Sequence, residues 1–349
     1  MDLLTLFENE YRIISIVGMA KNAGKTVTLN HLIDEMANRN MCVGLTSIGR
    51  DGERQDIVTK TDKPMIYVTK NSIVATAEML FNLSEVKMAV LEVTEHHTAM
   101  GRVIIGRTLN DGFVQVGGPT TNAAIRNVSE KMIEYGADYV LVDGALDRTS
   151  SASPAITDAC ILSTGAAVSR DMMKTVEQTS YRASLFKLDE MKDETICALW
   201  EQAEQHKKPI LVNQDGEYTV LTDVPTALGA GRIIAQAIDE TTNALIIPGA
   251  LVTQTVMDVV ESTPNYKNIT WIVGDATKIF IDQKDFNYFM RIGVKINVRY
   301  AIKLLAITIN PYAPAGYFYD SELFKEALLQ RIKALPVIDV MADNGQSSI

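Results

Sequence analysis

The sequence predicts an α/β protein with a mainly parallel sheet flanked by helices, plus a smaller C-terminal α/β domain. Short runs rich in Val and Ile alternate with longer segments of helical character. This is the pattern of buried parallel strands joined by crossover helices. The chain has 349 residues, and at roughly 150 residues per domain this length predicts about two domains.

The strands expected in the first domain all end in Gly or Thr. They cover residues 12–18, 42–49, 65–69, 88–94, 102–106, 113–118, 139–144 and 160–165. Ligands of doubly wound sheets bind just beyond the carboxyl ends of the strands, so polar residues at these ends are the candidates for function.

A second group of strands follows a polar, helix-favouring stretch over residues 171–206. The apolar runs are KKPILVN, YTVLT, ALIIPG, NITWIVG, KINVRY and LLAITIN, and the segment SELFKEALLQRIKAL predicts a helix after them. We therefore place the first domain at residues 1–205 and the smaller one at residues 206–349.

Composition and charge exclude several classes of protein. Hydrophobic residues make up 47% and charged residues 22%, which argues against disorder. The net charge of −10 offers no broad positive field, so nucleic acid is not an expected partner. Three cysteines without a CxxC pair, an acidic N-terminus and apolar runs of strand length predict a cytoplasmic protein without a membrane partner.

The strongest chemical signal is the loop GMAKNAGKT, residues 18–26, which follows the first expected strand and precedes a helical pattern. In such a loop, backbone N–H groups and the helix N-terminus surround phosphates. Lys25 would reach the terminal phosphates of ATP, and Thr26 would offer its hydroxyl to Mg²⁺. The nucleotide-binding residues are then Gly18, Asn22, Ala23, Gly24, Lys25, Thr26 and Val27. The alternative is an ordinary strand-to-helix turn that contains glycines.

The spacing of this loop differs from GxxxxGK[ST], because the position of the first glycine is occupied by Met19 and Gly18 lies one residue earlier. Gly followed by five residues and GKT resembles the loop of dethiobiotin synthetase and its relatives among the P-loop NTPases. The glutamate-containing strand motif of dethiobiotin synthetase is replaced here by VDGALDR. That departure puts biotin synthesis in doubt.

A magnesium site needs a carboxylate at the end of a neighbouring strand. Asp143 ends the apolar run YVLVDG, as the acidic residue of a Walker B strand does, so Lys25 and Asp143 are the candidate catalytic residues. An Asp at this place also caps helices, which is the alternative for Asp143. Asp51 in SIGRDGERQD is a further candidate metal ligand, and its alternative is a charged, solvated turn.

Other polar clusters at strand ends carry less chemistry. VTEHHT places Glu95, His96 and His97 beyond an expected strand, where a general base or substrate contact competes with a solvated loop. VGGPTTN is interpreted as a turn whose Thr and Asn residues cap the next helix. INPYAPAGYFYD, residues 309–320, is rich in aromatic residues and is interpreted as a packed loop or an interaction surface.

Over the full length, and especially in RIISIVGMAKNAGKTVTLNHL and GLTSIGRDGE, the sequence resembles the reactivase-associated subunits encoded with cobalamin-dependent lysine 5,6-aminomutases of lysine-fermenting bacteria. The resemblance implies an Mg²⁺-dependent ATPase that works with a second ATPase subunit to reactivate the aminomutase. The alternatives are a dethiobiotin synthetase-like ligase or kinase and a nucleotide-binding module without turnover. The oligomeric state stays open, with a homodimer as one arrangement.

Overall fold

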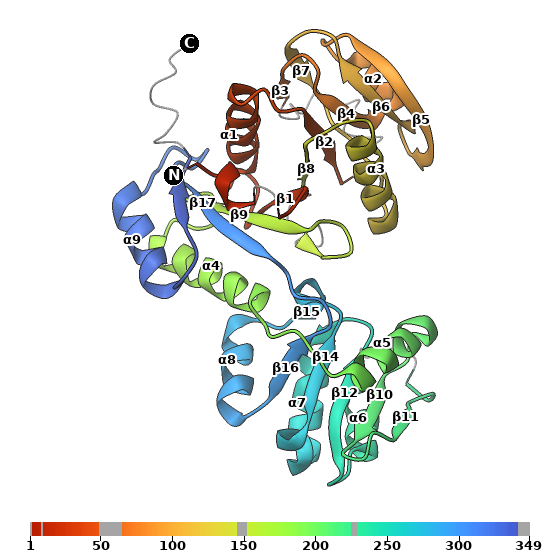
Figure 1. Cartoon of the computed structure of the whole chain (residues 1–349). Coiled ribbons are helices and arrows are strands. Elements are labelled where there is room, and N and C mark those ends of the chain that lie inside the picture. The colour runs from red at the N-terminus through yellow and green to blue at the C-terminus, as the bar shows by residue number, and fades with distance from the viewer. Residues whose placement is uncertain (1, 8–9, 49–64, 145–151, 225–228, 341–349) are drawn as a thin grey trace. The chain divides into compact units, whose positions relative to one another are not determined.

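The computed structural model describes residues 2–7, 10–48, 65–144, 152–224 and 229–340. Its chain divides into two compact units (Figure 1). Unit 1 combines Met1–Ser180 with Lys303–Ile349, and unit 2 is Tyr181–Ile302. This division differs from the expected boundary between residues 205 and 206, because the chain enters unit 2 earlier and afterwards returns to unit 1.

Unit 1 contains one large sheet, two paired strands beside it, and the helices that surround them. In chain order its elements are η1 (Leu4–Leu6), β1 (Ile13–Gly18), α1 (Lys25–Asn38), β2 (Val43–Ser47), β3 (Ile66–Val68), β4 (Ile73–Ala77), α2 (Glu78–Leu83), β5 (Met88–Thr98), β6 (Gly101–Thr108), β7 (Gly112–Val114), α3 (Asn122–Glu134), β8 (Tyr139–Asp143), β9 (Ala159–Gly165), α4 (Met172–Phe186, which continues into unit 2), β17 (Leu304–Asn310), α9 (Ser321–Arg331) and β18 (Val337–Asp339).

The large sheet confirms the mixed α/β prediction. Among the described residues its strands lie in the order β18-β17-β9-β1-β8-β2-β4-β6-β5. Neighbours from β18 to β4 are parallel, whereas β4–β6 and β6–β5 are antiparallel. β17, which the sequence analysis placed in the second domain, pairs with β9. β1 therefore lies inside the sheet, between β8 and β9.

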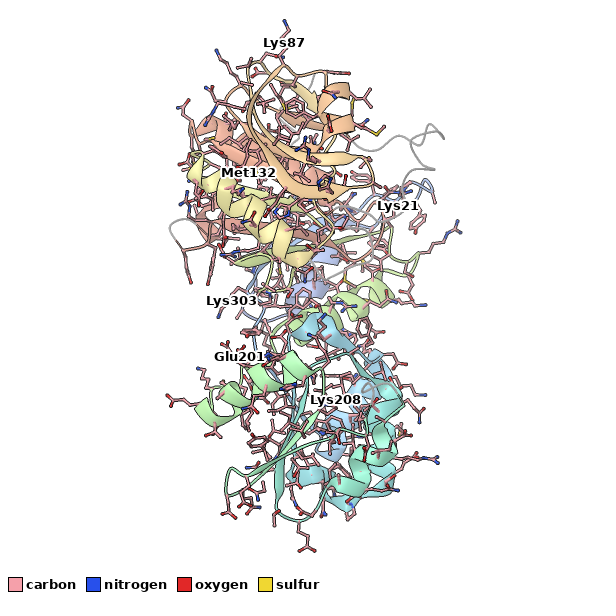
Figure 2. The ribbon with its side chains drawn as sticks, turned by 90° about the vertical axis from the view of Figure 1, so that its right-hand side faces the viewer. Lys21, Lys87, Met132, Glu201, Lys208 and Lys303 are labelled. Atoms are coloured by element: carbon pink, nitrogen blue, oxygen red, sulfur yellow. The ribbon has the colours of Figure 1, made fainter. Side chains whose placement is uncertain are left out.

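Alternate residues of the central strands pack on opposite faces of this sheet, as a buried strand requires. One apolar cluster joins Ile14 and Ile16 of β1 to Leu29 and Leu32 of α1. The other joins Ile13 of β1 to α3, where Met132, labelled in Figure 2, is fully buried. The two helices thus cover the two faces of the sheet. Because the apolar face of α1 packs on the sheet, the loop that precedes α1 is held at the sheet edge.

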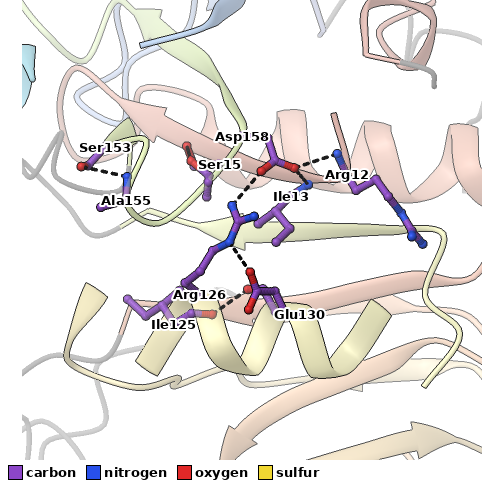
Figure 3. A network of polar contacts seen from close by, with 11 residues as sticks. Arg12, Ile13, Ser15, Ile125, Arg126, Glu130, Ser153, Ala155 and Asp158 are labelled. Atoms are coloured by element: carbon purple, nitrogen blue, oxygen red, sulfur yellow. Dashed lines mark hydrogen bonds and ion pairs between the residues drawn. The ribbon is translucent and has the colours of Figure 1, made fainter. Parts of the chain in front are cut away.

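The amino end of β1 is held by a single carboxylate (Figure 3). Asp158 accepts hydrogen bonds from the backbone N–H groups of Arg12 (3.0 Å) and Ile13 (2.9 Å) and from the Arg126 guanidinium (2.7 Å). Burial disfavours the charged carboxyl, but these donors together lower the pKa of Asp158 below its usual value. Arg126 also donates to Glu130 at 2.7 Å.

Unit 2 has its own sheet, which in the described part of the unit follows the order β11-β10-β12-β14-β16. Its elements are α5 (Glu194–His206), β10 (Ile210–Asn213), β11 (Tyr218–Val220), α6 (Gly231–Ala237), β12 (Thr242–Ile247), β13 (Leu251–Val252), α7 (Thr253–Ser262), η3 (Pro264–Asn268), β14 (Thr270–Val273), η4 (Ala276–Lys278), β15 (Ile279–Phe280), α8 (Gln283–Ile292) and β16 (Lys295–Val298). Strands β12, β14 and β16 are parallel. No helix within the described ranges of the chain is long and apolar enough to cross a membrane.

Candidate functional site

The glycine-containing loop lies where the sequence predicted it, between the carboxyl end of β1 and the N-terminus of α1. Asn22 and Gly24 both have positive φ angles, 62° and 105°, which Asn tolerates and Gly favours. An added Cβ at Gly24 would also lie 2.9 Å from Cβ of Asn310. The loop is therefore tightly turned, and its last residue before α1 has to be glycine.

The first glycine of the loop makes room for the lysine. A Cβ at Gly18 would lie 2.9 Å from both Cγ and Cδ of Lys25, so the lysine stem folds back across Gly18. The Lys25 side chain is largely buried, and its Nζ donates to the backbone carbonyl of Gly144 at 2.5 Å. Lys25 thus reaches from α1 to the residue that directly follows β8.

Asp143 is the last residue of β8 and is half-buried. It is paired in register with Ile16 of β1 on one side and with Ser47 of β2 on the other. The structure therefore places it at the carboxyl edge of the sheet, one residue from the carbonyl that Lys25 contacts. The alternative role of Asp143, as the cap of a helix, would involve the residues after Gly144. Residues 145–151 lie outside the described part of the chain.

The remaining predicted loop residues differ in exposure. Asn22 is exposed, Ala23 is fully buried, and Thr26 and Val27 are half-buried in the first turn of α1. Val27 packs against the apolar cluster beneath α1. Ala23 and Val27 thus have only backbone groups for a polar ligand, whereas Asn22 also has an exposed amide and Thr26 a hydroxyl.

The donors at this edge suit a hard cation. The Thr26 hydroxyl and the Asp143 carboxylate are oxygen ligands of the kind that Mg²⁺ prefers, and this ion usually keeps waters and takes few protein ligands. No group of three or more His, Cys, Asp and Glu side chains gathers as a metal site within the described ranges. Asp51, the further metal candidate, lies outside the described residues.

Three polar residues that the sequence did not single out contact the loop or the first turn of α1. The backbone carbonyl of Ser163 in β9 accepts the N–H of Met19 at 2.9 Å. Thr308 in β17 is 2.7 Å from the hydroxyl of Thr28 in α1, and Asn310 at the end of β17 lies against Gly24. The signal in the sequence was a polar residue inside an otherwise apolar run, which is Ser163 in CILSTG and Thr308 and Asn310 in LLAITIN.

Glu95, His96 and His97 lie within β5 and not in a loop beyond it, which corrects the expectation. The β5–β6 pairing continues through His97 opposite Arg102 and Thr98 opposite Gly101, with a register shift that accommodates the residues between Val93 and His97. His96 Nε2 lies 2.9 Å from Oδ1 of Asn127 in α3. This contact joins β5 to α3. β5 is the edge strand of the sheet and lies far from β1, which carries the loop, in the strand order.

The turn VGGPTTN behaves as predicted. Thr121 is the N-cap of α3, and its side chain accepts the N–H of Ala124 at 3.3 Å. Its role is local, because a capped first turn stabilises the helix that covers one face of the sheet.

Comparisons of this chain with protein-family models, with curated proteins and with solved structures gave no match.

Proposed function

We propose that the edge formed by the loop 18–26 and the end of β8 binds ATP with Mg²⁺ and hydrolyses it. One observation carries the proposal. The Lys25 side chain crosses Gly18 and ends 2.5 Å from the Gly144 carbonyl, so the lysine of the loop and the acidic end of the neighbouring strand belong to one site.

The roles follow from the chemistry of each group. The backbone N–H groups of the loop and the N-terminus of α1 stabilise the negative charge of the phosphates. Lys25 exchanges its contact with the Gly144 carbonyl for the terminal phosphates, which is a stronger interaction because both partners are charged. Thr26 and Asp143 would hold Mg²⁺, and the ion when bound neutralises charge that develops on the phosphate oxygens.

The wider role rests on the sequence resemblance. We propose that hydrolysis serves an accessory task in which this chain and a second ATPase subunit restore a cobalamin-dependent aminomutase. A damaged cofactor that stays tightly bound leaves only if the ATP-bound and ADP-bound states bind the aminomutase differently.

The site is tested with the full-length chain and two lysine variants of the same loop. Lys25→Ala should abolish ATP–Mg²⁺ binding in calorimetry and ADP release, while circular dichroism and the unfolding midpoint stay close to those of the wild type. Lys21→Ala is the matched control, because Lys21, labelled in Figure 2, is exposed in the same loop. Wild-type-like ATP binding by Lys25→Ala would overturn the proposal.

The accessory role is tested separately by adding the aminomutase and its neighbouring gene products to the ATPase assay. Stimulated ADP release supports the role. Hydrolysis that ignores these proteins but rises with a metabolite extract contradicts it and supports the ligase or kinase, whereas binding without any ADP release supports a module without turnover. GTP in place of ATP tests the preference for the base.

A further inference from the structure

Three buried hydroxyl groups meet beneath the loop, from three elements that are far apart in the sequence. The oxygen of Thr308 in β17 lies 2.7 Å from that of Thr28 in α1 and 2.9 Å from that of Ser163 in β9. Thr28 and Ser163 are 3.2 Å apart. None of the three side chains is more than 1% exposed, so water does not compete for these hydrogen bonds.

The number of hydroxyl hydrogens decides which oxygen donates and which accepts in this cluster. The Thr28 hydroxyl also lies 3.1 Å from the carbonyl of Gly24, and a carbonyl only accepts, so Thr28 donates to it. Each hydroxyl has one hydrogen. Thr308 then donates in its 2.7 Å contact with Thr28, and Ser163 donates in its 2.9 Å contact with Thr308, which leaves no hydrogen for the longer contact of 3.2 Å between Ser163 and Thr28. The result is a chain of three hydrogen bonds that starts on β9, passes through β17 and ends at the carbonyl of Gly24.

This chain ends at the residue that precedes Lys25. The same Gly24 carbonyl accepts the backbone N–H of Thr28 at 2.9 Å, which begins the hydrogen bonding of α1. The other end of the loop is held by β9, through Met19 N–H and the Ser163 carbonyl. Strands β9 and β17 therefore fix both ends of the loop, and β17 belongs to the segment that returns from unit 2.

We propose that Thr308 is a positioning residue for the phosphate-binding loop. Its hydroxyl fixes the Gly24 peptide through Thr28 and so sets where the loop N–H groups and Lys25 point. The inference rests on the proposed function for its effect on ATP. Its effect on the loop itself does not depend on that function.

The test compares Thr308→Val with two other variants of the full-length chain. Valine keeps the shape of threonine and removes the hydroxyl, whereas Thr308→Ser restores it. Thr179→Val is the matched control, because the hydroxyls of Thr179 and Thr164 form a separate pair at 2.7 Å in unit 1 and both residues are fully buried. Thr308→Val loses two buried hydrogen bonds and Thr179→Val loses one, so the unfolding free energy of both variants is measured and only a change confined to Thr28 counts for the positioning role.

Two readouts are measured. Amide hydrogen exchange without nucleotide should be about fivefold faster at Thr28 in Thr308→Val, the factor expected for the one hydrogen bond lost to Thr28, and unchanged in Thr179→Val and Thr308→Ser. ATP–Mg²⁺ affinity should fall by a similar factor, about fivefold, in Thr308→Val alone.

The outcomes separate this inference from the proposed function. Equal exchange at Thr28 in the two valine variants overturns the positioning role, whatever the ATP result. Faster exchange confined to Thr308→Val, in a wild-type chain that binds no ATP, supports the positioning of the loop and contradicts the proposed function. Faster exchange with unchanged ATP affinity refutes the effect on ATP.

Discussion

The two ends of strand β1 are held by different chemistry. At the amino end, the charged carboxylate of Asp158 is bound by two backbone N–H groups and by Arg126. At the carboxyl end, the loop is held by neutral groups, which are the Ser163 carbonyl and the hydroxyl chain through Thr308. The amino end uses its charge to stabilise the fold. The loop at the carboxyl end is held by neutral groups, and under the proposed function the nearby charge of Lys25 binds phosphate.

The largest expected effect comes from removing the carboxylate that holds the amino end of β1. Asp158→Ala removes the acceptor for three donors, including the N–H of the buried Ile13, and should lower the free energy of unfolding by about 3 kcal/mol, since hydrogen bonds to charged groups are the strong ones. ATP–Mg²⁺ affinity, measured well below the unfolding temperature, should not change. Denaturant unfolding measures the change in stability, and calorimetry measures the ATP–Mg²⁺ affinity. Loss of ATP affinity with unchanged stability would show that the two ends are not separate.

The next largest effect comes from distorting the loop at the carboxyl end of β1. Gly24→Ala forces an L-residue to a φ of 105° and places its Cβ 2.9 Å from that of Asn310. The loop should shift, and the ATP turnover proposed for this site should fall by about a hundredfold, as expected for a misplacement of about 1 Å. Steady-state ADP release measures this. Gly249→Ala is the control, because a Cβ there meets no atom within 4 Å. Normal turnover in Gly24→Ala would mean that the loop conformation does not matter to the site.

The loop at the carboxyl end of β1 could be predicted from the sequence, whereas the residues from other strands that hold the loop could not. Gly18, Gly24 and Lys25 are close together in the chain, so their spacing alone predicts a strand, a turn and a helix. Thr308 reaches the loop only because β17 pairs with β9 after the whole of unit 2 has intervened. An apolar run such as LLAITIN fits any buried strand position equally well, so its pairing could not be predicted.

The edge of the large sheet shows the same limit. Apolar and polar residues alternate poorly over residues 88–98, so the sequence predicts a strand that ends at residue 94, before Glu95. In the structure the strand continues to Thr98, because β6 supplies partners across a register shift. β4, which was not predicted, contains small residues in the run IVATA and is identified only by its pairing with β2 and β6. Tertiary pairing overrides local preference at such strands.

Acid should weaken the amino end of β1. The pKa of Asp158 is lowered in the folded state, so its contribution is complete above the unfolded value of about 3.9 and is lost as the pH falls through the folded value. The difference in free energy of unfolding between the wild type and Asp158→Asn should be constant above about pH 5 and shrink below about pH 4. Urea unfolding across this range measures it. A difference that persists unchanged at the lowest pH would contradict the assignment of charge.

The smallest expected effect tests which contacts of Arg126 matter. Its guanidinium bonds both Asp158 and Glu130 at 2.7 Å, but the side chain of Glu130 is 50% exposed and that of Asp158 is 26% exposed. Exposed pairs one helical turn apart are worth about 0.3–0.5 kcal/mol, since water and salt screen them. Glu130→Gln should therefore cost less than about 0.5 kcal/mol, and added salt should remove that cost. Asp158→Asn, unfolded under the same conditions, is the comparison. Equal costs for the two variants would mean that Arg126 acts as a surface charge, and that the amino end of β1 is held by the backbone bonds to Asp158 without help from the guanidinium.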